Sequence, residues 1–95
     1  MIIGVLKMEL SLPGCASLKE KRSRLKPFLA RLHREFDVSA AEIDRHDLWG
    51  SAVVACAIVT NDAGHAEACL QAIVHWAETH WPDLPLDADE IEIIQ

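Results

Sequence analysis

The hydrophobic residues change their spacing along the chain, from a period of two to a period near 3.6 and back, and this order constrains the fold. Residues 2–12 alternate apolar and polar side chains, which is typical of a half-buried strand. Pro13-Gly14 ends that strand, and residues 17–20 (SLKE) have the spacing of a capping box that begins a helix. The helical period predicts a helix to about Phe36, with its buried face formed by Leu18, Leu25, Phe28, Leu29, Leu32 and Phe36.

Pro27 falls inside this predicted helix. An interior proline removes one backbone hydrogen bond and costs about 3 kcal/mol. Counting about 100° per residue places Pro27 on the side opposite the apolar face, where water can satisfy the freed Ser23 carbonyl. We therefore expect one helix that bends around the core, and not two helices.

The second half of the chain repeats the pattern. Val38–Asp44 is predicted as a short strand, and the apolar residues 51–60 as a central strand covered on both faces. Asn61-Asp62 caps a second helix that runs to about His80 and ends before Pro82 and Pro85. Residues 90–94 (EIEII) form the last strand. The buried stripe of the second helix is predicted to contain Ala66, Leu70, Ile73, Val74 and Ala77.

The resulting order, βαββαβ, predicts an α+β fold of the ferredoxin-like type, formed by residues 1–95 as a single domain. Right-handed crossovers then give an antiparallel sheet in the order 4-1-3-2, with both helices on one face. The first and last strands are expected to pair.

No targeting or membrane segment is visible. The longest apolar run, residues 52–59, is too short to span a bilayer, and the N-terminus lacks the basic region and cleavage site of a signal peptide. Cys15, Cys56 and Cys69 are odd in number and far apart, which favours reduced thiols. We expect a cytoplasmic protein.

Charge is distributed unequally along the chain. Residues 1–37 carry eight Lys or Arg and four Asp or Glu, a net +4, whereas residues 38–95 carry only Arg45 against eleven acidic residues, a net −10. Together these give the net charge of −6. A domain polarised in this way can attract nucleic acid along one element and repel it elsewhere. The cations of the first helix are Lys19, Lys21, Arg22, Arg24, Lys26, Arg31 and Arg34.

Five stretches of the chain resemble the YlxP-like family of small bacterial proteins of unknown function. They are GVLKMEL (4–10), SLKEKRS (17–23), VSAAEIDRHDLW (38–49), VTNDAGHAE (59–67) and EIEI (90–93). The resemblance implies the same ferredoxin-like fold. Genes of this family commonly lie near those of translation initiation factor 2 and ribosome-binding factor A, which implies a link to translation or ribosome assembly. It implies no catalytic residue, and Pro27 departs from what we expect of the family.

The strongest candidate for a binding surface combines the start of the first helix with the connection at 45–50. Cations in the first turns oppose the helix dipole, so fold stability gives no reason for three of them there. Trp49 could stack on an unpaired base while the cations hold phosphates. The alternative is a solvated helix face with Trp49 folded over the end of the sheet. The predicted RNA-binding residues are Lys19, Lys21, Arg22, Arg45, His46 and Trp49.

Other candidates give weaker signals. Residues 13–17 lead into a helix N-terminus, where a small ligand could bind as in regulatory domains of this topology. His65 and Cys69 have a spacing that suits two metal ligands, but two ligands are not a site, so we expect no metal. No motif of a nucleophile elbow, P-loop or dinucleotide site occurs, so we expect neither an enzyme nor a cofactor.

The uncovered sheet face offers a third function. Ile3, Val5 and one face of the strand at 51–60 would be exposed there, and contiguous apolar surface usually marks an interface. A homodimer through the open sheet face is therefore an alternative, as is ligand sensing at 13–17. We favour a non-catalytic RNA- or ribosome-associated binding module.

Overall fold

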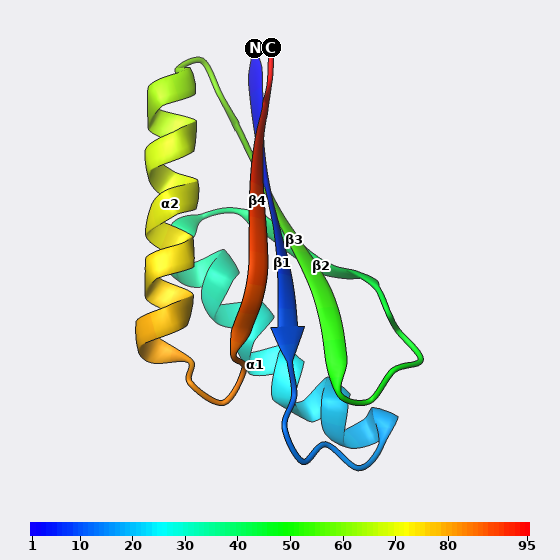
Figure 1. The fold of residues 1–95 in the computed structure, drawn as a ribbon. Helices are drawn as coiled ribbons and strands as arrows, with labels where there is room; N and C mark the ends of the chain where they lie inside the picture. Colours follow the sequence, from blue (N-terminus) through cyan, green and yellow to red (C-terminus); the bar gives the residue numbers. More distant parts are fainter.

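A four-stranded antiparallel sheet with both helices on one of its faces forms the molecule (Figure 1). The structure is a computed structural model and describes residues 1–95. Its elements in chain order are β1 (Ile2–Ser11), α1 (Leu18–Phe36), β2 (Ser39–Asp44), β3 (Ser51–Thr60), α2 (Ala63–His80) and β4 (Leu86–Ile94). The sheet order is β2-β3-β1-β4, which confirms the predicted order and the ferredoxin-like fold.

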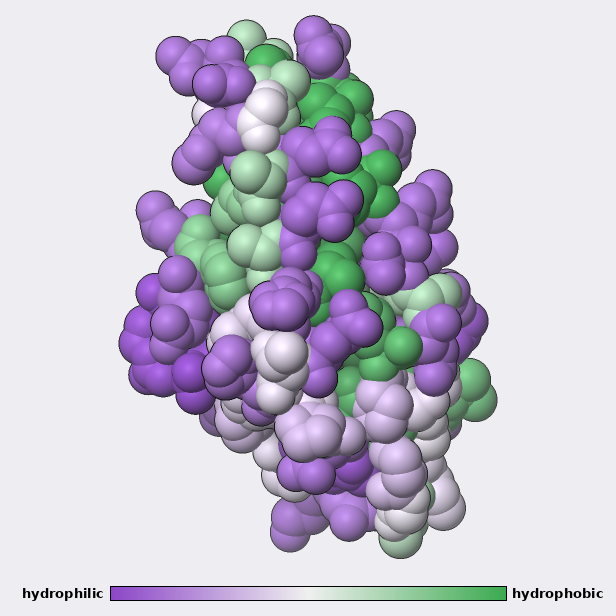
Figure 2. All heavy atoms as spheres, turned by 60° about the vertical axis from the view of Figure 1, so that its left-hand side comes forward, coloured by the Kyte–Doolittle hydropathy of each residue, from purple (hydrophilic) through white to green (hydrophobic).

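The central strand β1 pairs with β3 on one side and with β4 on the other, both antiparallel. The alternation predicted for this strand is confirmed, because Leu6, Met8, Leu10 and Leu12 are at most 1% exposed. These side chains point toward the two helices, and Phe28, Leu32, Leu70 and Ile73 pack over them without measurable exposure. Helix α1 lies over the β2 side of the sheet, and α2 covers β1 and β4. On the α2 side, hydrophobic atoms form a lengthwise band flanked by hydrophilic ones (Figure 2).

Helix α1 begins and continues as its sequence predicts. The Ser17 hydroxyl accepts a hydrogen bond from the Glu20 N–H at 3.1 Å, and the Glu20 carboxylate accepts one from the Ala16 N–H in return. The capping box thus forms, although its return bond reaches one residue further back than in the usual motif. Pro27 is exposed, and α1 is a single helix through it.

Helix α2 approaches β1 closely because the strand carries Gly4 beneath it. A Cβ atom at this position would lie 3.1 Å from Ile58 Cγ2, 3.1 Å from Leu70 Cδ1 and 3.2 Å from Ala66 Cβ. These distances are shorter than ordinary van der Waals contacts, so a larger side chain at position 4 would push α2 outward.

Two details differ from the sequence-based expectations. Strand β4 begins at Leu86 and not at Glu90, because its first residues pair with β1 across an irregularity between Glu9 and Leu10. The Ser11 N–H also donates to the Pro85 carbonyl at 2.9 Å, and this bond holds the residue before β4 against the end of β1. On α2, the buried stripe contains Trp76, which the sequence did not indicate. Val74, which was expected in the stripe, is only partly buried.

Trp76 is buried because it joins an aromatic cluster between the two helices. Its ring centroid lies 5.8 Å from that of Phe28, 5.4 Å from that of Phe36 and 5.6 Å from that of Trp81. The Arg31 guanidinium covers the cluster, 5.8 Å from the Trp76 ring. This cluster closes the end of the core opposite the start of α1. Neither helix is long and apolar enough to cross a membrane.

A candidate nucleic-acid interface

The first turns of α1 and the connection between β2 and β3 are joined by a buried lysine. The Lys21 side chain is 2% exposed, and its Nζ donates a hydrogen bond to the Arg45 carbonyl at 2.6 Å. The same Nζ lies 2.7 Å from Glu42 Oε2, an ion pair without hydrogen-bond geometry, since Oε2 has no hydrogen-bond partner. Lys21 therefore holds the start of the connection, at Arg45, against α1, and the end is held at Gly50, whose carbonyl accepts from the Leu12 N–H at 2.9 Å.

The prediction that Lys21 contacts RNA is wrong. Its ammonium group lies inside the protein, where a phosphate could not reach it without displacing Glu42 and the 45–50 connection. Burial of a lysine requires a paired charge and hydrogen-bond acceptors, and β2 and the connection supply both. Lys21 therefore has a structural role, because Glu42 and the Arg45 carbonyl hold its ammonium group inside the protein.

Arg45 belongs to the same connection but points the other way. Its φ of 61° places it in the left-handed region, and its own N–H donates to the Asp44 carboxylate at 2.7 Å. The guanidinium donates to the Ser51 hydroxyl at 2.8 Å and pairs with Glu9 on β1. Its charge is therefore compensated over the open sheet face, and it is a weaker candidate for phosphate than the sequence indicated.

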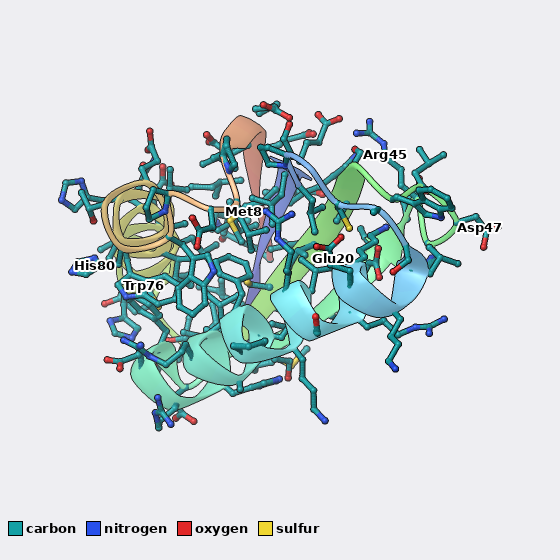
Figure 3. All side chains as sticks on the ribbon, turned by 90° about the horizontal axis from the view of Figure 1, so that it is seen from below. Met8, Glu20, Arg45, Asp47, Trp76 and His80 are labelled. Carbon is teal, nitrogen blue, oxygen red and sulfur yellow. The ribbon has the colours of Figure 1, made fainter.

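The remaining predicted residues are exposed. Lys19, Arg22 and His46 are on the surface without an ion pair, and the Trp49 side chain is 52% exposed beside Leu48, which is 53% exposed. Trp49 is not among the residues that pack against the hydrophobic core. Figure 3 shows Arg45 and Asp47 near the N-terminal end of α1, far from Trp76 and His80 at the α2 side. The exposed tryptophan and the two exposed α1 cations thus belong to one end of the molecule.

Two of the other α1 cations have structural partners. The Arg24 guanidinium donates to the Pro13 carbonyl at 2.9 Å and to the Asp83 carbonyl at 2.7 Å, which ties two loops to the helix. Arg31 pairs with Glu35 and stacks on the aromatic cluster. Lys26 and Arg34 are exposed and carry no ion pair. Periodicity alone does not identify Arg24 or Arg31 as structural, because the carbonyl partners of Arg24 lie on two loops and the aromatic partners of Arg31 lie on α2 and just after it.

The loop at 13–17 has few free groups for a ligand. The Ala16 N–H already donates to Glu20, the Cys15 N–H donates to the Leu12 carbonyl at 3.2 Å, and the Pro13 carbonyl is taken by Arg24. None of the surface hollows is lined by residues 13–17. The anion position at this helix N-terminus is filled by the protein's own carboxylate.

The open sheet face mixes apolar and charged residues. Ile3 pairs with Val59 and Ile94, and Val5 with Ala57 and Glu92, so these side chains share the face. Further along it, Lys7 pairs with Ala55 and Glu90. Val59 is 67% exposed and Ile94 44% exposed. The apolar residues therefore concentrate at the end of the sheet that carries both termini.

The thiols of Cys56 and Cys69 are hard to ionise. Burial, with a smaller contribution from the neighbouring Cys69, raises the pKa of Cys56 from 9.0 to about 12. Burial also raises the pKa of Cys69. A thiol with a raised pKa stays protonated and unreactive at neutral pH, so these cysteines act as small apolar side chains.

This shift predicts a loss of stability in alkaline solution. The Cys56 thiol ionises above pH 9.0 in the unfolded chain but only near pH 12 in the folded protein. The contribution of the protonated thiol to the free energy of unfolding is therefore complete below pH 9.0 and declines between pH 9.0 and about 12. From about pH 8 to about pH 10, the wild type should lose about 1 kcal/mol more unfolding free energy than Cys56→Ala. Urea unfolding at the two pH values measures this difference. Equal losses in the two proteins would contradict the assigned shift.

The element order, the open antiparallel sheet and the helices on one face define an α+β protein of the ferredoxin-like class. A de novo designed protein, Foldit4, shares this fold with a TM-score of 0.54 at 14% identity, over 99% of this chain and 96% of that one.

Residues 3–89 match the family described as "Protein of unknown function (DUF503)", and the chain belongs to this family. It is 32% identical to the uncharacterized protein YlxP of Bacillus subtilis (strain 168) over 78 residues. These matched residues make up 82% of this chain and 85% of that protein. The resemblance to the YlxP-like family is thereby confirmed.

Proposed function

We propose that the protein is a non-catalytic RNA-binding module, linked to the ribosome or to translation, that contacts single-stranded RNA through Trp49 and the exposed start of α1. The observation that carries this proposal is Trp49, half exposed on a connection that Lys21 holds at Arg45 and the Leu12 N–H holds at Gly50. An aromatic side chain on a fixed support is a suitable platform for stacking an unpaired base.

The charges around Trp49 support the same function. Lys19 and Arg22 are exposed on the adjoining turns of α1 without acidic partners and can hold phosphates. Two of the nearby acidic groups are engaged locally, since Glu20 caps the helix and Asp44 accepts from the Arg45 N–H, whereas Asp47 is exposed and adds one negative charge beside Trp49. The link to the ribosome rests on the gene neighbourhood that the family resemblance implies.

Removing the exposed cations should change the salt dependence of RNA binding. Each phosphate contact on a single strand contributes about 0.7 to the slope of log affinity against log salt. Lys19→Ala/Arg22→Ala should therefore flatten this slope by about 1–1.5 in titrations of a fluorescent single-stranded oligonucleotide. Lys7→Ala, an exposed lysine on the open sheet face, is the matched control and should leave the slope unchanged.

Removing the tryptophan should lower the affinity for RNA without changing its salt dependence. Trp49→Ala should cost about 1–3 kcal/mol of single-strand affinity with nearly the same slope, because stacking releases no counterions. Co-sedimentation with ribosomes across a salt series tests the ribosomal link directly. If the wild type binds neither the oligonucleotide nor ribosomes at about 50 mM salt, where phosphate contacts are strong, the proposed function is wrong.

A further inference from the structure

The two edges of the sheet are both open. Strand β2 pairs only with β3, and β4 only with β1. Every second residue of an edge strand directs its N–H and C=O groups away from the sheet, where another strand can pair with them. What could pair with each edge depends on the side chains that surround it.

The β2 edge is accessible and bordered by cations. Its first residues are Ser39, Ala40 and Ala41, whose small side chains leave the backbone uncovered. Between α1 and β2 lies a surface hollow of about 220 Å³ whose floor contains Leu25 and Leu29. Its other lining residues are Arg22, Lys26 and Glu42; Glu42 is paired with Lys21, whereas the two cations are exposed and unpaired.

The β4 edge is acidic. The strand carries four exposed carboxylates and no basic residue; they belong to Asp87, Asp89, Glu90 and Glu92. Helix α2, which covers this side, carries Glu67 and Glu78 and no Lys or Arg. By contrast α1, on the β2 side, carries seven Lys or Arg and two Glu. Strand β2 itself adds Glu42 and Asp44, so α1 and β2 together carry seven cations and four carboxylates, whereas α2 and β4 carry six carboxylates and no cation. The two sides of the sheet therefore have opposite net charge.

We propose that the β4 edge of one copy docks on the β2 edge of a second copy, so that the two sheets continue as one. In this sheet order β4 runs antiparallel to β2, so the new pair has the antiparallel arrangement of the existing ones. Asp89 is opposite Met8 in the register and hence lies on the helix side of β4. On docking, its carboxylate lies on the side of the hollow that Arg22 and Lys26 border.

Charge also selects this head-to-tail contact over the symmetric ones. Pairing β2 with a second β2 would place the exposed cations of two α1 helices side by side, and pairing β4 with β4 would oppose two rows of carboxylates. Like charges across an interface suppress such pairings. A head-to-tail contact leaves one free edge at each end, so association can continue beyond a dimer.

Charge reversal on each edge tests the contact by sedimentation velocity from micromolar to millimolar protein. The wild type should associate as its concentration rises. Arg22→Glu/Lys26→Glu and Asp89→Lys should each weaken association about tenfold or more, because each reverses the charge on one side of the contact. Their equimolar mixture should associate again, since each variant keeps the edge that the other has lost. Lys19→Glu reverses a charge on α1 outside the hollow and should leave association unchanged.

Each other result contradicts the proposal in a recognisable way. A wild type that stays monomeric at millimolar concentration overturns it. Association that neither variant weakens indicates the open sheet face, and association that only the α1 variant weakens indicates a symmetric β2 contact. Circular dichroism of both variants separates these results from unfolding. RNA binding is measured separately on dilute protein, so failure of one proposal is distinct from failure of the other.

Discussion

Replacing Lys21 by alanine should cost about 3–5 kcal/mol of unfolding free energy, as expected when one partner of a buried ion pair is removed. The change leaves the Glu42 carboxylate without its cation and the Arg45 carbonyl without its donor. Chemical denaturation measures the loss, and Arg22→Ala is the matched control. Arg22 is the next residue along the same helix but is exposed, so its loss should change stability by less than about 0.5 kcal/mol.

A second variant separates the ion pair from simple loss of packing. Lys21→Met/Glu42→Leu removes both charges and keeps the apolar volume, so it should recover most of the stability lost in Lys21→Ala. If Lys21→Ala were no more destabilising than Arg22→Ala, the burial of Lys21 described above would be wrong. Lys21 would then return to the set of cations available for RNA.

Truncation of Phe28 should have a comparable effect for a different reason. Its ring is fully buried and contacts Trp76 at 5.8 Å and Trp81 at 5.4 Å between ring centroids. Phe28→Ala should cost about 3–5 kcal/mol through lost burial and the cavity left between the helices. Urea unfolding followed by tryptophan fluorescence measures the cost and reports the changed surroundings of Trp76 and Trp81. Leu29→Ala, a half-buried neighbour, should cost clearly less.

The fold could be predicted because its local signals agree with one another. The alternation in β1, the capping box before α1 and the apolar strand β3 each identify an element, and right-handed crossovers then leave one arrangement. The start of β4 could not be predicted, because Asp87 and Asp89 on an edge strand obscure the apolar alternation. Trp76 was missed because its burial depends on Phe28 and Phe36, which belong to a different helix.

The candidate site could be predicted only in part. Trp49, Lys19, Arg22 and His46 are on the surface at one end of the molecule, as the sequence indicated. Lys21 and Arg45 are engaged by Glu42 and Glu9, which lie 21 and 36 positions away along the chain. Sequence spacing on one helix gives no information about such tertiary partners. The number of cations clustered in a sequence is therefore only an upper limit on the number that a ligand can reach in the folded protein.

The two ends of the chain offer a practical means of handling the protein. Ile3 pairs with Ile94, and both termini lie together at the end of the sheet (Figure 1), away from the connection that carries Trp49. A dye or an affinity tag attached at either end would therefore leave that connection facing the solution. A short flexible linker could also join the ends, and a circularly permuted chain opened between β3 and α2 should keep every strand pairing intact.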